Sequence, residues 1–126
     1  MKKAAKTFNP TATNPARALQ AWQILIGVAS NGQTITYKEL SQIMYRKDAA
    51  GVLAYILGHI AYWCEERNLP QLNAIVVRKD SKEPGDGIPL EKGASHYEIE
   101  RVHREYWFDI VPPTEEELAA AYNTSP

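Results

Sequence analysis

Apolar side chains recur every three or four residues in the first part of the chain, which is the spacing of one face of an α-helix. The helix is predicted to start at Asn14, which can cap it, and Pro15 suits the first helical position. Asn31 and Gly32 mark its end. The apolar face of this helix consists of Ala18, Leu19, Trp22, Leu25, Ile26 and Ala29.

A short second helix is predicted directly after a β-prone run at residues 33–36. Thr36 and Glu39 have the spacing of a capping box, in which each side chain accepts a hydrogen bond from the backbone N–H of the other residue. The helix should therefore cover about residues 37–44, with its apolar side chains at Leu40, Ile43 and Met44.

A longer third helix is predicted after a break at residues 45–47. It should start at Asp48, a residue that caps helices well, and end at Arg67. We expect a bend or break near Gly58, because Gly51 and Gly58 each weaken a helix by about 1 kcal/mol relative to alanine. The apolar positions of this helix are Val52, Leu53, Ile56, Leu57, Ile60 and Trp63.

The second half of the chain predicts two strands and two helices around a long polar turn. The β-branched run LNAIVVR is typical of a strand, and Thr114 and Glu117 repeat the capping-box spacing. In chain order the elements are a strand at 72–78, a wing-like or hairpin-like turn at 79–93, a helix at 94–105, a strand at 106–111 and an acidic helix at about 115–122.

These elements predict an α+β fold in a chain of 126 residues, which is the length of one domain. Residues 14–126 are expected to form a single winged-helix-like domain with a helix-turn-helix core, a small β-hairpin or sheet and a C-terminal helix. Residues 1–13 are polar, basic and without period, so they are expected to form a flexible arm. In a helix-turn-helix the second helix enters the major groove of DNA; an αα-hairpin that only builds a core is the alternative.

The charge of the chain is divided unevenly. Residues 1–47 hold seven lysines and arginines and a single carboxylate, a net charge of +6, and the rest of the chain therefore carries −7. A basic first half suits contact with a phosphate backbone. An acidic second half suits a basic partner, or simply keeps the protein soluble.

Three segments resemble a known family in their order and spacing. GQTITYKELSQ, AAGVLAYILG and PQLNAIVVRKDSKEPGDG are similar to the C-terminal winged-helix domain of O6-alkylguanine-DNA alkyltransferases and of alkyltransferase-like proteins, over residues 20–87. Tyr37, Glu39 and Leu40 match the family's signature at the start of the motif. The resemblance implies that Tyr37 contacts the DNA phosphate beside a flipped base.

The family's reactive residues are replaced in this chain. Asn73 stands where the family has its alkyl-accepting cysteine, and an amide cannot act as the thiolate nucleophile, so alkyl transfer is excluded. Gly51 stands where the family inserts an arginine into the DNA stack, so base flipping would need Arg46 or Tyr45 as a substitute. The protein is therefore predicted not to be an enzyme.

The remaining residues predict neither a metal site nor a cofactor. Cys64 is the only cysteine, so no disulfide forms within one chain, and His96, Glu100 and His103 are better explained as a solvated helix face than as metal ligands. No apolar run is long enough to span a membrane, and no secretory signal is present, so a cytoplasmic location is expected.

The favoured hypothesis is a non-enzymatic protein that binds the phosphate backbone of duplex DNA through its helix-turn-helix. Contact would come from the break between the two helices, from the start of the first of them, and from the wing. The candidate DNA-binding residues are Tyr37, Lys38, Tyr45, Arg46, Lys47, Gly51, Asn73, Arg78, Lys79 and Lys82.

Two other functions fit the sequence. The first is a small protein-binding inhibitor or adaptor, of the type found in phages and mobile elements, acting through acidic residues between 83 and 105 toward a basic partner. These residues are Glu83, Asp86, Glu91, Glu98, Glu100 and Glu105. The second is an enzyme that holds a small ligand between Asn73 and the loop at 79–87.

Overall fold

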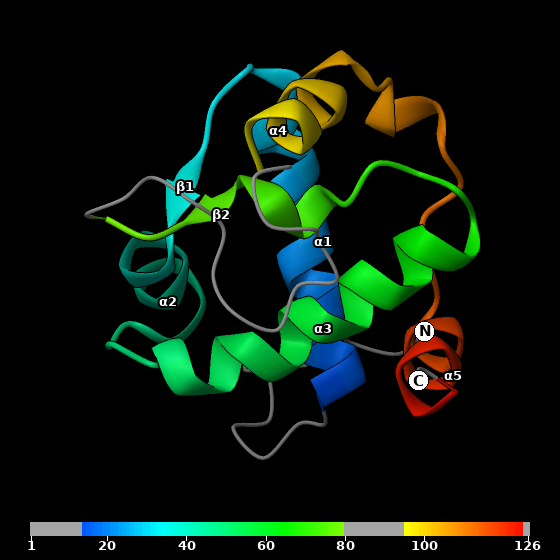
Figure 1. Cartoon of the computed structure of the whole chain (residues 1–126). Helices are drawn as coiled ribbons and strands as arrows, with labels where there is room; N and C mark the ends of the chain where they lie inside the picture. Colours follow the sequence, from blue (N-terminus) through cyan, green and yellow to red (C-terminus); the bar gives the residue numbers. More distant parts are fainter. Residues whose placement is uncertain (1–13, 80–94, 125–126) are drawn as a thin grey trace, which may run out of the picture.

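The computed structural model describes residues 14–79 and 95–124, which form five α-helices and a two-stranded parallel sheet (Figure 1). In chain order the elements are α1 (Asn14–Ser30), β1 (Ile35–Thr36), α2 (Tyr37–Tyr45), α3 (Ala50–Glu66), the 3₁₀ helix η1 (Leu72–Ile75), β2 (Val76–Val77), α4 (Ser95–Arg104), the 3₁₀ helix η2 (Trp107–Asp109) and α5 (Glu115–Asn123). None of the described helices is both long and apolar enough to cross a membrane.

Helix α1 lies at the centre of the core and contacts α3, α4, α5, η1 and η2. In Figure 1, α2 lies to the left of α1 and α5 to its right. The ring of Trp22 on α1 packs edge-on against the rings of Trp63 and Trp107, with centroid distances of 5.0 Å and 5.6 Å. Three segments that are far apart in the sequence are thereby joined at one buried aromatic cluster.

The predicted helix starts at Thr36 and Thr114 are confirmed. In each capping box the threonine Oγ1 accepts from the backbone N–H of the glutamate at 3.1 Å, and the glutamate side chain accepts from the threonine N–H at 2.9 Å. Helix α3 begins at Ala50, two residues after Asp48, and the hydroxyl of Ser41 on α2 accepts from the N–H of Ala49. A tertiary contact with α2 therefore helps to hold the start of α3.

Helix α3 runs through Gly58 without the break that the sequence allowed there as one of two outcomes, a bend or a break. A Cβ atom at this position would lie 3.0 Å from Cε1 of Tyr122 on α5. Glycine at this position therefore lets α5 approach α3 closely.

The sequence predicted a single strand at 72–78, and this prediction is wrong. Leu72–Ile75 forms a 3₁₀ turn, with the N–H of Ala74 donating to the carbonyl of Gln71 at 2.8 Å, and only Val76 and Val77 are extended. The turn contacts α1, α3 and α4 and is wholly buried, so its apolar side chains serve packing on several sides rather than a sheet. The strand pair is parallel, with Ile35 opposite Val76, and is not a hairpin.

The second predicted strand, at 106–111, is also replaced by a 3₁₀ turn, η2. Trp107 is buried against Trp22, and its indole N–H donates to the carbonyl of Val102 at 2.8 Å. Tyr106 and Phe108 on either side are 77% and 70% exposed. One buried indole therefore decides the local conformation, against the β propensity of its neighbours.

His59 joins α3 to α5 and lies in surroundings that disfavour its protonated form. Its ring stacks on the ring of Tyr122 with a centroid distance of 4.2 Å, and Nδ1 donates to the carbonyl of Tyr55 at 2.8 Å. Burial lowers the pKa of His59 below its ordinary value of 6.5, and the hydrogen bond to Tyr55 opposes that shift only in part. The folded protein therefore binds a proton at His59 less readily than the unfolded chain does.

We expect the unfolding temperature to fall as the pH is lowered from 7 to 5, because the stability from neutral His59 is complete only above the unfolded pKa of about 6.5. His59→Gln should reduce this slope. His96 and His103 are unchanged in both proteins, so the difference between their unfolding temperatures across the pH series reports His59 alone. Equal slopes would show that His59 does not titrate differently in the folded and unfolded states.

Candidate nucleic-acid interface

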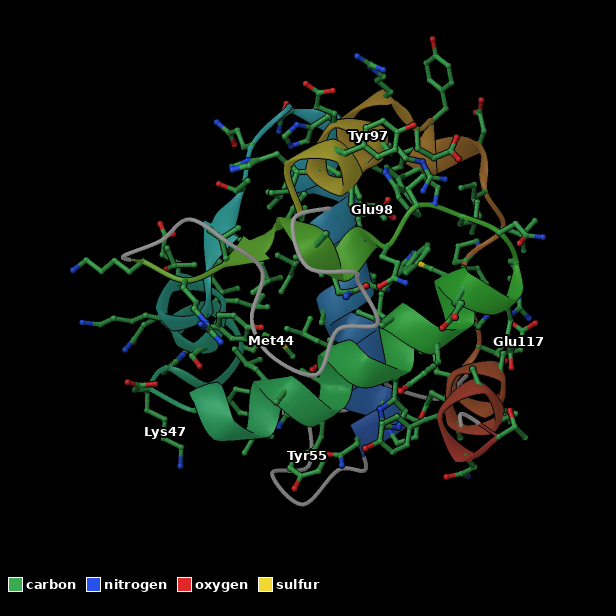
Figure 2. All side chains as sticks on the ribbon, viewed as in Figure 1. Met44, Lys47, Tyr55, Tyr97, Glu98 and Glu117 are labelled. Atoms are coloured by element: carbon green, nitrogen blue, oxygen red, sulfur yellow. The ribbon has the colours of Figure 1, made fainter. Side chains whose placement is uncertain are left out.

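The connection between α2 and α3 presents two cations to solvent. Arg46 ends α2 in the left-handed conformation, with φ at 59°, and its N–H donates to the carbonyl of Gln42 at 3.0 Å. This sharp turn leaves Arg46 and Lys47 exposed, and Figure 2 shows Lys47 projecting away from the body of the protein. Neither side chain forms an ion pair with a carboxylate of the described residues. Their charge is therefore available to an external anion.

A hollow of about 750 Å³ opens beside this connection, and we call it the basic hollow. Three cations line it, together with two amides and an apolar wall, and none of the described residues that line it is an aspartate or glutamate. The lining residues are Arg17, Gln20, Gln23, Ile24, Ile43, Met44, Tyr45, Arg46 and Lys47.

Helix α1 supplies the side of the basic hollow that sequence analysis missed. Arg17, Gln20 and Gln23 are spaced three residues apart on α1, and Arg17 donates to Oε1 of Gln20 at 3.0 Å. Their spacing signals a polar helix face. Only the packing of α1 against α2 shows that this face meets Arg46 and Lys47.

Tyr45 stabilises the wall of the basic hollow instead of reaching outward. The guanidinium of Arg17 lies 4.9 Å from the centroid of the Tyr45 ring, and the phenol oxygen is buried with no hydrogen-bond partner. Burial raises the pKa of Tyr45, and the charge of Arg17 opposes that shift. The prediction that Tyr45 contacts DNA is wrong for its hydroxyl, which has no access to a phosphate.

A second group of cations lies at the other end of α2. Because β1 and β2 are parallel and in register, with Thr36 opposite Val77, the residues that follow both strands emerge on the same side. They are Lys38, in the first turn of α2, and Arg78 and Lys79, all exposed. Helix α2 has nine residues and is thus about 13 Å long, so it carries cations at both ends.

The exposed side of the first turns of α3 is apolar. Gly51 is exposed with no atom within 4 Å of an added Cβ, and Val52 and Tyr55 are 44% and 57% exposed. Apart from the Tyr55 hydroxyl, this surface offers no side-chain group that could hydrogen-bond to a base edge. Tyr37 is half-buried and packs against the core, at the start of α2.

Asn73 does not belong to any surface. Its side chain is fully buried in η1, and both of its polar atoms lack a hydrogen-bond partner. The prediction that Asn73 binds DNA is therefore wrong in this conformation. Asn73 lines neither the basic hollow nor the hollow beside residues 103–109, and most of the loop at 79–87 lies outside the described residues.

Asn73→Leu is expected to raise the free energy of unfolding by about 1–3 kcal/mol, because it removes two buried polar atoms that make no hydrogen bond and keeps the branched shape of the side chain. Urea unfolding followed by tryptophan fluorescence would measure the change. Asn73→Asp, which has the same shape but places a charge there, should have the opposite effect. A loss of stability in Asn73→Leu would mean that the amide has a partner in solution.

The acidic residues proposed as a surface for a basic partner are only partly available. Glu98 is 6% exposed, accepts from the N–H of Gln71 at 2.7 Å and pairs with Arg101 at 2.8 Å, so it cannot act as exposed bait. Glu100 pairs with Arg104 at 3.6 Å. Lys82, Glu83, Asp86 and Glu91 lie outside the described residues, as do the arm at 1–13 and most of the turn at 79–93.

Other reactive side chains in the described segments have structural explanations. Burial raises the pKa of the Cys64 thiol to about 12, so its thiolate is not accessible near neutral pH. His103 is hydrogen-bonded through Nε2 to the carbonyl of Gln33 at 2.9 Å. Within residues 14–79 and 95–124, no three histidine, cysteine or acidic side chains are grouped as metal ligands would be.

Comparison of the chain with protein-family models, curated proteins and solved structures gives no match.

Proposed function

We propose that this protein binds duplex DNA without catalysing a reaction, by placing the α2–α3 connection and both ends of α2 against the phosphate backbone. In this proposal α2 and α3 act as a helix-turn-helix within a winged-helix-like domain. The observation that supports it most is the exposure of Arg46 and Lys47. Among the described residues they have no carboxylate partner, and they stand beside Arg17 in a hollow to which these residues contribute no acidic side chain.

The arrangement of the other cations supports the same surface. Lys38 lies at the other end of α2, about 13 Å of helix away from Arg46, and Arg78 and Lys79 follow the strand paired with β1 beside it. A duplex carries one negative charge per roughly 1.7 Å of its axis. Both groups of cations can therefore contact phosphates without a particular alignment of the protein along the DNA.

The apolar exposed side of α3 favours binding with little sequence preference. Bases are distinguished mainly by hydrogen bonds from side chains such as Arg, Asn and Gln, and the first turns of α3 expose Gly51, Val52, Ala54 and Tyr55. Small side chains at this point let the helix approach the DNA backbone closely. Phosphate contacts should then supply most of the affinity.

Two features support a role without catalysis. Asn73, which stands where the alkyltransferases that the chain resembles have their cysteine nucleophile, is buried and has no acid–base chemistry at neutral pH. The only thiol, that of Cys64, is buried and has a pKa of about 12. No nucleophile is therefore activated at either position.

Salt dependence of binding tests the proposal. Fluorescence anisotropy with a labelled duplex should give a linear fall of log K with log salt, with a slope of about −4 to −5 if all five cations at the ends of α2 contact phosphates. Duplexes of unrelated sequence should bind with similar affinity. Absence of binding at low salt, or binding that does not change with salt, would contradict the proposal.

A further inference from the structure

The turn η2 exposes two aromatic rings flanked by two carboxylates. Tyr106 and Phe108 are 77% and 70% exposed because Trp107 between them is anchored in the core by its contact with Trp22 and its hydrogen bond to Val102. We call Glu105, Tyr106, Phe108 and Asp109 the η2 face. Adjacent exposed aromatic side chains are more typical of binding surfaces than of a solvated turn.

The carboxylates of the η2 face are available to an external cation. Asp109 is exposed and Glu105 is half-buried, and neither forms an ion pair with a lysine or arginine of the described residues. Oε2 of Glu105 accepts only from the neighbouring N–H of Tyr106, at 3.2 Å. A hollow of about 540 Å³ adjoins this face and is lined by Ser30, His103 and residues 104–109.

The basic hollow has the complementary chemistry. It combines the cations Arg17, Arg46 and Lys47 with apolar side chains, one of which, Ile43, is 58% exposed. Its volume of about 750 Å³ is larger than one aromatic side chain requires. An aromatic ring entering it would meet apolar side chains and guanidinium groups, both of which attract aromatic rings, while a flanking carboxylate would meet Lys47 or Arg46.

The two surfaces cannot meet within one molecule. In Figure 1 the α2–α3 connection lies at the lower left and η2, coloured orange, at the upper right, and Figure 2 shows Lys47 pointing away from that side. Opposite charges at opposite ends of a molecule favour contact between one end of a copy and the other end of the next.

We propose that copies of this chain associate head to tail, with the η2 face of one copy docked in the basic hollow of another. Such a contact is heterologous, because the two surfaces differ. A chain of copies therefore has an unused basic hollow at one end and an unused η2 face at the other. Duplex DNA uses the same cations in the function proposed above, so DNA and a second copy compete for the basic hollow.

Sedimentation velocity of the full chain, from micromolar to millimolar concentration, tests the association. We expect the weight-average mass to rise above that of the monomer with concentration and to return to it in high salt or on addition of duplex DNA. A monomer at every concentration overturns the proposal.

Two double variants locate the contact. Glu105→Lys with Asp109→Lys reverses the acidic charge of the η2 face, and Arg46→Glu with Lys47→Glu reverses the charge of the connection. We expect each variant alone to be monomeric, because its two surfaces then carry charge of the same sign, and an equimolar mixture to associate, because each variant retains the surface that the other lacks. A variant at Arg46 and Lys47 that still associates alone indicates a symmetric contact and overturns the proposal.

Matched controls separate this inference from DNA binding and from misfolding. Glu115→Lys with Glu116→Lys makes the same change of charge at the exposed start of α5 and should leave association intact. The Glu105 and Asp109 variant should retain DNA binding, so failure of either function can be recognised without the other. Tyr106→Ser with Phe108→Ser changes no charge and should also abolish association, while a mass that rises with concentration as in the unaltered chain overturns the role of the aromatic rings.

Discussion

Reversal of charge at both Arg46 and Lys47 is expected to weaken binding of duplex DNA by about 100-fold or more at 0.1 M salt. Each phosphate contact makes the slope of log K against log salt more negative by about 0.9. Lowering the salt from 1 M to 0.1 M therefore strengthens binding about tenfold for each contact. Removing two contacts should therefore also make the slope less steep by about 2. Repulsion between the new carboxylates and the phosphates adds to the loss.

The single variants Arg46→Glu and Arg104→Glu form a matched pair for this experiment. Both make the same change of charge at an exposed arginine, but Arg104 lies on α4 and pairs with Glu100, away from the α2–α3 connection. We expect Arg46→Glu to bind DNA about tenfold more weakly, and Arg104→Glu to bind almost as the unaltered chain does. Equal losses in the two variants would show that only net charge matters and that the connection is not the contact surface.

Folding should be unaffected by these substitutions, because the substituted side chains are exposed. Arg46 and Lys47 form no ion pair with a described residue, and the pair between Arg104 and Glu100 lies at the surface. Surface changes of this kind alter stability by about 0.5 kcal/mol or less. The positive φ of Arg46 does not select between arginine and glutamate, since both carry a Cβ and an unbranched chain. Unfolding temperatures of the variants close to that of the unaltered protein would confirm that any loss of binding arises at the surface.

Trp22→Ala is expected to lower the free energy of unfolding by about 3–5 kcal/mol. Trp22 is 1% exposed and contacts both Trp63 and Trp107. Its loss removes a buried aromatic surface and leaves a cavity between α1, α3 and η2, which surrounding side chains can fill only in part. Domains of this size are commonly stable by about 5–15 kcal/mol, so this substitution should remove a large part of the stability of the fold.

Urea unfolding followed by circular dichroism measures this effect, with Tyr106→Ala as the control. Tyr106 is also an aromatic residue beside the cluster, but it is 77% exposed, and its removal should change stability by less than about 1 kcal/mol. A loss below about 1 kcal/mol for Trp22→Ala would show that the three tryptophans do not form the centre of the core in solution.

The candidate surface was only partly predictable from the sequence. The exposure of Arg46 and Lys47 follows from a local signal, the break between two amphipathic helices, and sequence reasoning found it. The contribution of Arg17 does not follow from any local signal, because it depends on α1 packing against α2 at one particular rotation. The burial of Asn73 and the inward orientation of the Tyr45 hydroxyl likewise depend on neighbours from distant segments.

What the sequence alone determined are the features whose causes lie within a few residues: the capping boxes that start α2 and α5, the apolar face of α1, and the break that exposes Arg46 and Lys47. Tertiary structure decided the conformations at 72–78 and 106–111. In both segments the β-branched and aromatic side chains have similar local preferences for a strand, and contacts with α1 instead hold Leu72–Ile75 and Trp107–Asp109 in 3₁₀ turns. Local propensity differs between such conformations by only about 1 kcal/mol, whereas burial of one large side chain contributes roughly 1.5–3 kcal/mol, so packing prevails.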